Sequence, residues 1–256
     1  MDIIKHALNK KLFGGMGGAS GESVIPDGYI KPKGTLTIKA NGDYDVAKYA
    51  EANVNVPIPL TGNLEWVETD TGVQYVIKNT DCIIAGHGEI PESLSTGHKD
   101  MQRVFIADGV TGIGSRAFQD CSSLTSIVIP NSVTSIGHYA FWACTGLTEI
   151  NIPDSVTSIG LCSFVRCNGL TEVNIPDSVT GIGQSAFSGC NGLTEVTIGN
   201  SVTYIGEWAF RECTSLASIA YTGTIEQWNA IQFGTNWNQN VPATEVICSD
   251  GTVALV

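Results

Sequence analysis

VTSIGLCSFVRCNGLTEVNIPDS, residues 156–178, is one of five consecutive units that are each 23 residues long. The units begin at Val110, Val133, Val156, Val179 and Val202. The Ile, Gly, Phe, Cys and Leu found here at 159, 160, 164, 167 and 170 recur at the same places in every unit. Repeats of about 20–50 residues are typical of solenoids, in which each unit stacks on its neighbours. The period therefore predicts a stacked array.

The second half of each unit alternates as a β-strand does. In the first unit Leu124, Ile127 and Ile129 are expected to point inward, while Ser126 and Val128 point outward. The Phe, Cys and Leu before each strand are three residues apart, which predicts one face of a short helical turn. We therefore expect an α/β solenoid with a parallel sheet and short helical turns.

The register extends past the five units. Residues one period earlier match the strand positions, and residues one period later match the Val, Ile and Phe positions. These residues are Met101, Val104 and Ile106 at the start, and Ile225, Trp228 and Phe233 at the end. Atypical terminal units are expected because they cover an otherwise open core. We assign an entry cap to residues 61–100, the repeats to 101–224 and an exit cap to 225–256.

The unit Val-Thr-x-Ile-Gly-x-x-Ala-Phe-x-x-Cys-x-x-Leu-Thr-x-Val-x-Ile-Pro resembles the BspA-like (TpLRR-type) leucine-rich repeats, and the resemblance covers residues 72–235. TDCIIAGHGEIP at 80–91 is similar to the entry cap of that family, and TGTIEQWN at 222–229 to its exit cap. Ser163 departs from the Ala of the pattern. The resemblance implies an α/β leucine-rich-repeat solenoid that serves surface adhesion and binds proteins or glycans, without catalysis.

The chain is acidic, with 13 Lys and Arg against 25 Asp and Glu and a formal net charge of −12. Binding to phosphates needs a basic face, so nucleic acid is excluded as a partner. No run of about 18 apolar residues occurs, so we expect no membrane insertion. Residues 1–60 hold seven basic and six acidic residues, whereas residues 61–256 hold six and nineteen. The two parts are therefore expected to have different roles.

The first 60 residues are expected to anchor the protein in an assembly. Residues 1–23 combine a short amphipathic helix with a Gly-rich linker. Residues 24–60 alternate polar and apolar residues around a turn at Asn41 and Gly42, which predicts a small β module. The N-terminus has no continuous apolar segment of the kind that secretion signals contain. Segments this short bury too little alone, so we expect a homo-oligomer or docking on a partner.

Part of this anchor has a second resemblance. IPDGYIKP at 25–32, GTLTI at 34–38 and NGDYDV at 41–46 are similar to segments of tail and other virion proteins of phages that infect Gram-positive gut bacteria. This resemblance implies a protein that is made in the host cytoplasm and contacts other virion proteins through residues 1–60.

The eight cysteines raise the question of disulfides or metal sites. Five of them occupy the Cys position of the repeat, where a free thiol packs as a small apolar group. Stacked coils bring Cα atoms to about 5 Å, which also permits disulfides, so both states stay open. Cys162 and Cys167 have no second pair at ligand spacing, so no metal is expected. No hydrolase, zinc-protease or phosphate-loop motif occurs, so we expect no catalytic residue and no cofactor.

The candidate binding residues are those that the repeat does not dictate. Three glutamates and two asparagines are expected to stack in columns on the outer strand face, beside Thr197. These residues are Glu149, Glu172, Glu195, Asn151 and Asn174. Like charges one rung apart repel, so the column is either a solvated product of duplication or an acidic stripe for a basic partner or a cation. Exposed aromatic residues favour binding, and those at variable positions around the turns are Tyr139, Trp142, Tyr204 and Trp208.

Three functions are compatible with these features. The first is a non-enzymatic phage virion protein, associated with the tail or fibre, whose solenoid contacts a host surface protein or glycan. The second is a BspA-like adhesin on the bacterial cell surface. The third is an intracellular scaffold for protein interactions.

Overall fold

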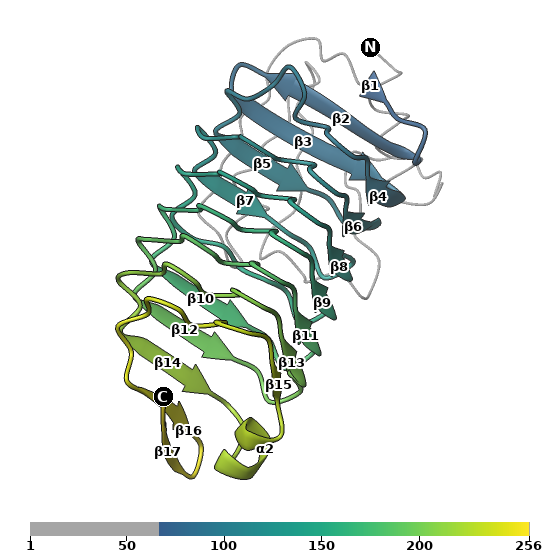
Figure 1. Cartoon of the computed structure of the whole chain (residues 1–256). Coiled ribbons are helices and arrows are strands. Elements are labelled where there is room, and N and C mark those ends of the chain that lie inside the picture. The colour runs from purple at the N-terminus through teal and green to yellow at the C-terminus, as the bar shows by residue number, and fades with distance from the viewer. Residues whose placement is uncertain (1–66, 256) are drawn as a thin grey trace, which may run out of the picture.

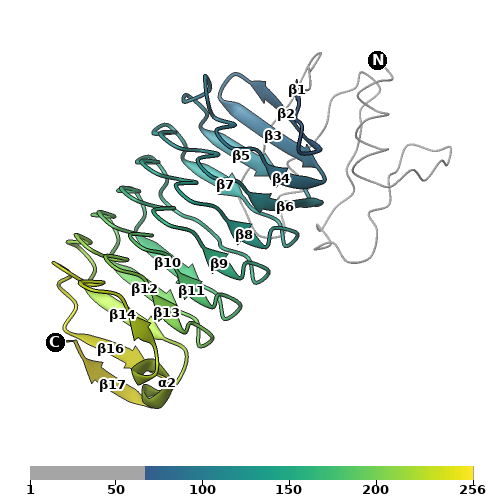
Figure 2. The ribbon, with the colours of Figure 1, turned by 45° about the vertical axis from the view of Figure 1, so that its right-hand side comes forward.

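The computed structural model describes residues 67–255. The amphipathic helix, the Gly-rich linker and the β module expected before residue 61 lie outside the described residues. The described chain winds into a β-solenoid whose turns stack along one axis (Figure 1). Two rows of strands run along the solenoid on separate faces, as the turned view also shows (Figure 2).

The first face is a seven-stranded parallel sheet in the order β15-β13-β11-β9-β8-β6-β4. Its strands are β4 (Gly88–Ile90), β6 (Val110–Ile113), β8 (Ser135–Ile136), β9 (Ser158–Ile159), β11 (Gly181–Ile182), β13 (Tyr204–Ile205) and β15 (Gln232–Phe233). Within the repeats they are formed by the Val-Thr-x-Ile start of each unit, which is rich in the β-branched residues that favour strands. This sheet was not predicted from the sequence.

The second face carries two five-stranded sheets, in the orders β1-β2-β3-β5-β7 and β10-β12-β14-β16-β17. The strands of the first are β1 (Val67–Glu68), β2 (Val73–Lys78), β3 (Asp81–Gly86), β5 (Arg103–Ile106) and β7 (Ser126–Val128). Those of the second are β10 (Glu172–Ile175), β12 (Glu195–Ile198), β14 (Ser218–Tyr221), β16 (Glu245–Cys248) and β17 (Gly251–Ala254). The expected alternation of inward and outward side chains is confirmed, because Ile127 and Ile129 are buried while Ser126 and Val128 are partly exposed.

The turns between the two faces are not helical, which corrects the expected α/β class to a β-solenoid with very little helix. Between residues 67 and 255 the structure contains one α-helix, α2 (Ile225–Asn229). Each repeat turn holds two residues with left-handed backbone, such as Arg116 at φ 55° and Asp120 at φ 61°. Every second N–H group of these turns points at the next coil, as where Phe118 donates to the carbonyl of Ala140 at 2.8 Å. Those between them donate to the carbonyl three residues back, as from Cys121 to Phe118 at 3.2 Å. Because the turns combine these two kinds of bond, they do not form the i to i−4 ladder of an α-helix.

A column of five phenylalanine rings fills the centre of the solenoid. The rings belong to Phe118, Phe141, Phe164, Phe187 and Phe210, and all five side chains are 0% exposed. Neighbouring rings are stacked, with centroids 5.0 to 5.4 Å apart. The five repeat cysteines are also fully buried, and each thiol from Cys144 onward donates to the carbonyl of a Phe in the previous coil, as from Cys144 to Phe118 at 3.1 Å. The core positions predicted from the repeat are confirmed.

The exit cap corrects one part of the predicted register. Phe233 pairs with Ile205, so it occupies the Ile position of the repeat and not the Phe position. Trp237 takes the Phe position, with its ring edge-on to Phe210 at 6.1 Å. The reason is α2, a short helix closed by a capping box between Thr224 and Gln227, which lengthens the last coil. At the other end the extension is confirmed, since Val104 pairs with Ile127.

The corner after each Val-Thr-x-Ile strand has no room for a side chain. A Cβ at Gly183 would lie 2.6 Å from the carbonyl carbon of Gly160 and 2.7 Å from the amide nitrogen of Leu161, whereas a Cβ at Gly181 would meet nothing within 4 Å. We therefore expect Gly183→Ala to lower the free energy of unfolding by about 1–3 kcal/mol or more, because packed backbone must move. Gly181→Ala should leave it unchanged or raise it by about 0.5–1 kcal/mol. Urea denaturation of both variants measures the difference, and equal stabilities would show that the corner is loosely packed.

Candidate functional site

Two columns of polar side chains lie on the outer side of the second face. In β10 and β12, Glu172 pairs with Glu195 and Asn174 pairs with Thr197. These residues alternate with buried ones along each strand, so their side chains leave the core. One coil earlier, Asn151 forms a bridge to Asn174, which continues the column. The stacking predicted from the 23-residue period is therefore confirmed.

A groove of about 340 Å³ lies on this part of the sheet face. Its polar lining comes from Ser126, Glu149, Asn151, Glu172, Asn174, Glu195 and Thr197. Ile127, Ile150 and Val173 also border it, but their side chains point into the core and they are only 2–7% exposed. The groove is thus bordered mainly by polar and acidic side chains.

The groove coincides with a break in the sheet. Among the described strands none pairs β7 with the following coil, and the segment 149–152 joins β10 only through the Asn151 bridge. In other coils of this face a backbone bond ties the start of the strand to the previous coil, as from Thr194 N–H to the carbonyl of Thr171 at 2.8 Å. Among the described residues, neither Thr148 nor Thr171 makes such a bond. The open ladder separates the two five-stranded sheets and gives the groove its place.

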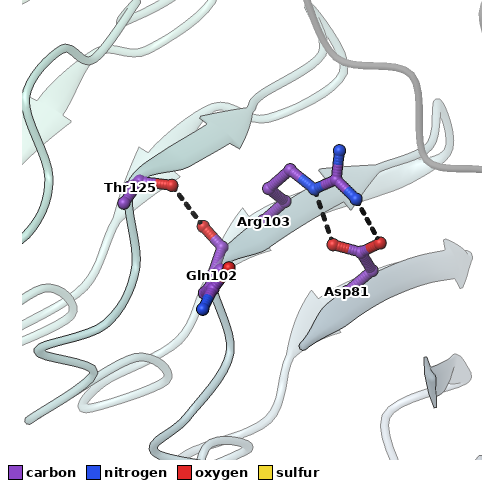
Figure 3. A network of polar contacts seen from close by, with 4 residues as sticks. All are labelled: Asp81, Gln102, Arg103 and Thr125. Carbon is purple, nitrogen blue, oxygen red and sulfur yellow. Dashed lines mark hydrogen bonds and ion pairs between the residues drawn. The ribbon is translucent and has the colours of Figure 1, made fainter. Parts of the chain in front are cut away.

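Within the described residues 67–255, no cation neutralises the acidic column. Across residues 67–255, no ion pair or hydrogen bond involves the side chains of Glu149, Glu172 or Glu195. The entry end of the same face differs, because Arg103 Nε donates to Asp81 Oδ1 at 2.6 Å (Figure 3). Like charges on neighbouring strands oppose pairing. The column is therefore electrostatically unfavourable in the free protein, and a cationic partner would relieve that repulsion.

The candidate aromatic residues do not line the groove. Tyr139, Trp142 and Trp208 lie in the turns, where Arg116 sits over the Tyr139 ring at 5.2 Å and Arg211 over the Trp208 ring at 5.6 Å. Tyr204 belongs to β13 in the seven-stranded sheet, so it is not on the turn side where the sequence analysis placed it. The structure therefore separates these residues from the glutamate column, and they do not form one site with it.

Four groove residues were not singled out from the sequence. Ser126 was recognisable, because it occupies the glutamate position one period before Glu149. The other three are Ile127, Ile150 and Val173, whose apolar character indicated only a place in the core. Their contact with the groove depends on the open ladder, which leaves no local sequence signal.

The described part of the chain offers little to support other chemistry. No group of three or more His, Cys, Asp or Glu between residues 67 and 255 is placed to hold a metal ion. Burial raises the pKa of the repeat thiols, Cys213 to about 12, so these cysteines are poor nucleophiles. No helix within the same range is long and apolar enough to cross a membrane.

A leucine-rich-repeat solenoid is defined by two strand rows per 23-residue coil, a buried Leu, Phe and Cys in each unit, and an open polar sheet face. The BspA type leucine rich repeat region matches six copies over residues 90–239. The chain belongs to this family.

Solved structures agree with this assignment. The T. pallidum leucine rich repeat protein is 25% identical with a TM-score of 0.54, over 65% of this chain and 85% of that one. A leucine rich cell surface protein from Faecalibacterium prausnitzii is 34% identical with a TM-score of 0.52, over 65% of this chain but only 42% of that one. The pneumococcal vaccine antigen PcpA, at 18% identity and a TM-score of 0.51 over 72% of this chain and 47% of that one, shares the fold. No curated protein matches the sequence.

Proposed function

We propose that this chain is a non-enzymatic adhesion protein that binds a macromolecule at a cell surface through the groove of the second face. The observation that carries this proposal is the groove itself, with its rim of exposed glutamates that no cation of the described residues neutralises. Exposed polar groups without partners cost the protein little in water but are available to a ligand. Membership of the BspA type family and the likeness to the F. prausnitzii cell surface protein support a surface role.

The test is a charge-matched pair of triple variants of the full chain. Glu149→Gln, Glu172→Gln and Glu195→Gln remove the groove carboxylates, and Asp70→Asn, Asp100→Asn and Asp154→Asn remove three exposed carboxylates outside the groove. Fluorescently labelled proteins are incubated with intact gut bacteria and with mammalian epithelial cells, and bound label is measured by flow cytometry. We expect the groove triple to lose at least tenfold in binding and the control triple to bind as the parent does. Equal loss in both triples, or parent binding no greater than that of an unrelated acidic protein, would overturn the proposal.

The groove triple should also be at least as stable as the parent protein. Removing like charges from neighbouring rungs relieves a repulsion of roughly 0.2–1 kcal/mol per pair, so the free energy of unfolding should stay level or rise slightly. Urea denaturation checks this, and it guards against a loss of binding that merely reflects unfolding. A fall of more than about 1 kcal/mol would contradict the repulsion argument.

A finer assignment is a phage virion protein of the tail or fibre, which uses residues 1–60 to contact other virion proteins and the solenoid to contact the host. It is favoured by the resemblance of residues 25–46 to virion proteins. Mass spectrometry of purified particles from an induced lysogen tests it directly. The protein should co-purify with particles, and fusing residues 1–60 to an unrelated soluble protein should carry that protein into them. If the protein does not co-purify with particles and the fusion does not enter them, the remaining candidate is an adhesin on a bacterial cell surface.

A further inference from the structure

Successive coils of the solenoid are separated by almost the same distance as successive turns of an α-helix. The stacked phenylalanine rings give coil spacings of 5.0 Å between Phe164 and Phe187 and 5.2 Å between Phe141 and Phe164. These three coils carry Glu149, Glu172 and Glu195 on the sheet face. One carboxylate is therefore presented about every 5 Å along the axis, whereas the pitch of an α-helix is about 5.4 Å.

We propose that the partner bound in the groove presents a basic helix, with Lys or Arg at i, i+4 and i+7, lying along the solenoid axis over the glutamate column. This inference rests on the proposed function of the groove. Residues at such spacings form one row on a helix surface, so one cation meets each carboxylate. An extended strand repeats a face only about every 6.7 Å, and it would lose register with the column within three coils.

The walls of the groove suit the side chains that such a helix would insert. Lys and Arg have long aliphatic stems that prefer apolar surface and a charged end that prefers water or a counter-ion. The rim carboxylates of Glu149, Glu172 and Glu195 match the charged ends, and the stems would lie along the exposed sheet face between them. A helix with side chains is about 10–12 Å across, so it would lie over the groove and only its side chains would enter.

The neighbouring column of polar side chains would keep such a helix parallel to the axis. Asn151, Asn174 and Thr197 stand beside the glutamates, at the same coil spacing. Their amide and hydroxyl groups can bond to polar side chains one helix position away from each cation. The strands β10 and β12, which carry paired members of both columns, follow one another along the stack in Figure 1.

The test uses the full chain and two synthetic helical peptides of identical composition, rich in Ala and Lys. In the first, the Lys residues share one face at i, i+4, i+7 and i+11 spacing. In the second, they are distributed around the helix, and circular dichroism confirms that both peptides have the same helix content. Fluorescence anisotropy at low ionic strength should give an affinity at least tenfold higher for the one-face peptide. A third peptide, the one-face peptide with a single central Ala replaced by Pro, should lose that advantage, because Pro breaks the helix.

Glu172→Gln removes the middle carboxylate and should reduce the tenfold preference for the one-face peptide to about twofold, while Asp154→Asn should leave it unchanged. Equal affinities for the one-face and distributed peptides, or a preference that survives Glu172→Gln, would overturn the helix proposal. If groove variants still lose cell binding in that event, the proposed function stands and only the helical partner falls. If neither cell binding nor peptide binding depends on the groove, both proposals fall.

Discussion

Moving the protein from pH 7 to pH 10 should lower its free energy of unfolding by about 6 kcal/mol through four of the five repeat cysteines. Burial raises the pKa of Cys144, Cys167 and Cys190 well above the ordinary 9.0, and that of Cys213 to about 12. In the unfolded chain these thiols ionise near pH 9, whereas in the folded protein they keep their protons. The stabilisation is therefore complete below pH 9 and is lost as the pH rises toward the folded pKa. By pH 10, each of the four thiols has lowered the free energy of unfolding by about 1.4 kcal/mol.

Urea denaturation under a reducing agent, repeated between pH 7 and pH 10, measures this loss. Tyrosine and lysine ionisation also act in this range, so the matched control is Cys167→Ala. That variant should lose about 1.4 kcal/mol less than the parent between the same two pH values, whatever its stability at pH 7. An identical pH dependence in the two proteins would show that Cys167 ionises as easily when folded as when unfolded.

Thiol labelling shows whether the five repeat cysteines are reduced or form disulfides. Alkylation of the native protein at pH 8 should leave Cys121, Cys144, Cys167, Cys190 and Cys213 unlabelled, because all five are fully buried. Alkylation after denaturation without reductant, under nitrogen, should label all five. Disulfide-linked peptides from adjacent coils in the second experiment would refute the thiol state and remove the basis of the alkaline prediction.

Phe164→Ala should lower the free energy of unfolding by about 3–5 kcal/mol, the usual cost of a large cavity in a packed core. Phe164 is fully buried at the middle of the phenylalanine column, and its ring stacks on Phe141 at 5.2 Å and on Phe187 at 5.0 Å. Because each coil contacts only its neighbours, the coils on either side cannot close the gap without breaking their own backbone bonds. Chemical denaturation of the variant provides the measurement, and a loss below about 1 kcal/mol would place Phe164 outside the core.

The adjacent residue provides a control of opposite sign. Ser163 is fully buried, and its hydroxyl has no hydrogen-bond partner. The equivalent positions in the other four repeats are Ala117, Ala140, Ala186 and Ala209, all buried. Ser163→Ala should therefore raise the free energy of unfolding by about 1–2 kcal/mol, since a buried unsatisfied group is removed at no cost in packing. A destabilising Ser163→Ala would mean that the hydroxyl is bonded in solution.

The core could be read from the sequence because the repeat imposes it five times. A residue type that recurs every 23 positions must meet the same environment in every coil, so Val, Ile, Phe, Cys and Leu each mark a buried column. The glutamate and asparagine columns followed from the same periodicity, since outward positions alternate with inward ones. The exit cap could not be read in this way, because α2 shifts the register by an amount that a fixed period does not contain.

The turns show where residue spacing was insufficient. Phe, Cys and Leu three apart are compatible with a helical turn, but the choice between a helix and this coil depends on where the backbone N–H groups find their acceptors. In the structure every second one finds its acceptor in the next coil, as from Phe164 to the carbonyl of Ala186 at 2.7 Å, and the others find it three residues back, as from Cys167 to Phe164 at 3.1 Å. Left-handed residues such as Tyr139 at φ 58° make this possible. Hydrogen bonds to the stacked neighbour offset that local strain, so the sequence of a single unit does not indicate the left-handed turn.

The sequence by itself determined the stacked architecture, the buried columns and the acidic column on the outer face, because each depends only on the repeat period and on side-chain alternation. The repeat pattern is the same in every coil, so it does not indicate which coil departs from the sheet. Tertiary structure decided that point, and therefore where the groove lies. The segment 149–152 has nearly the same sequence pattern as β10 and β12, yet it makes only the Asn151 bridge. Hydrogen bonds between coils form or fail according to how a whole strand sits against two neighbours. The outcome is therefore a property of the stack and not of any one repeat.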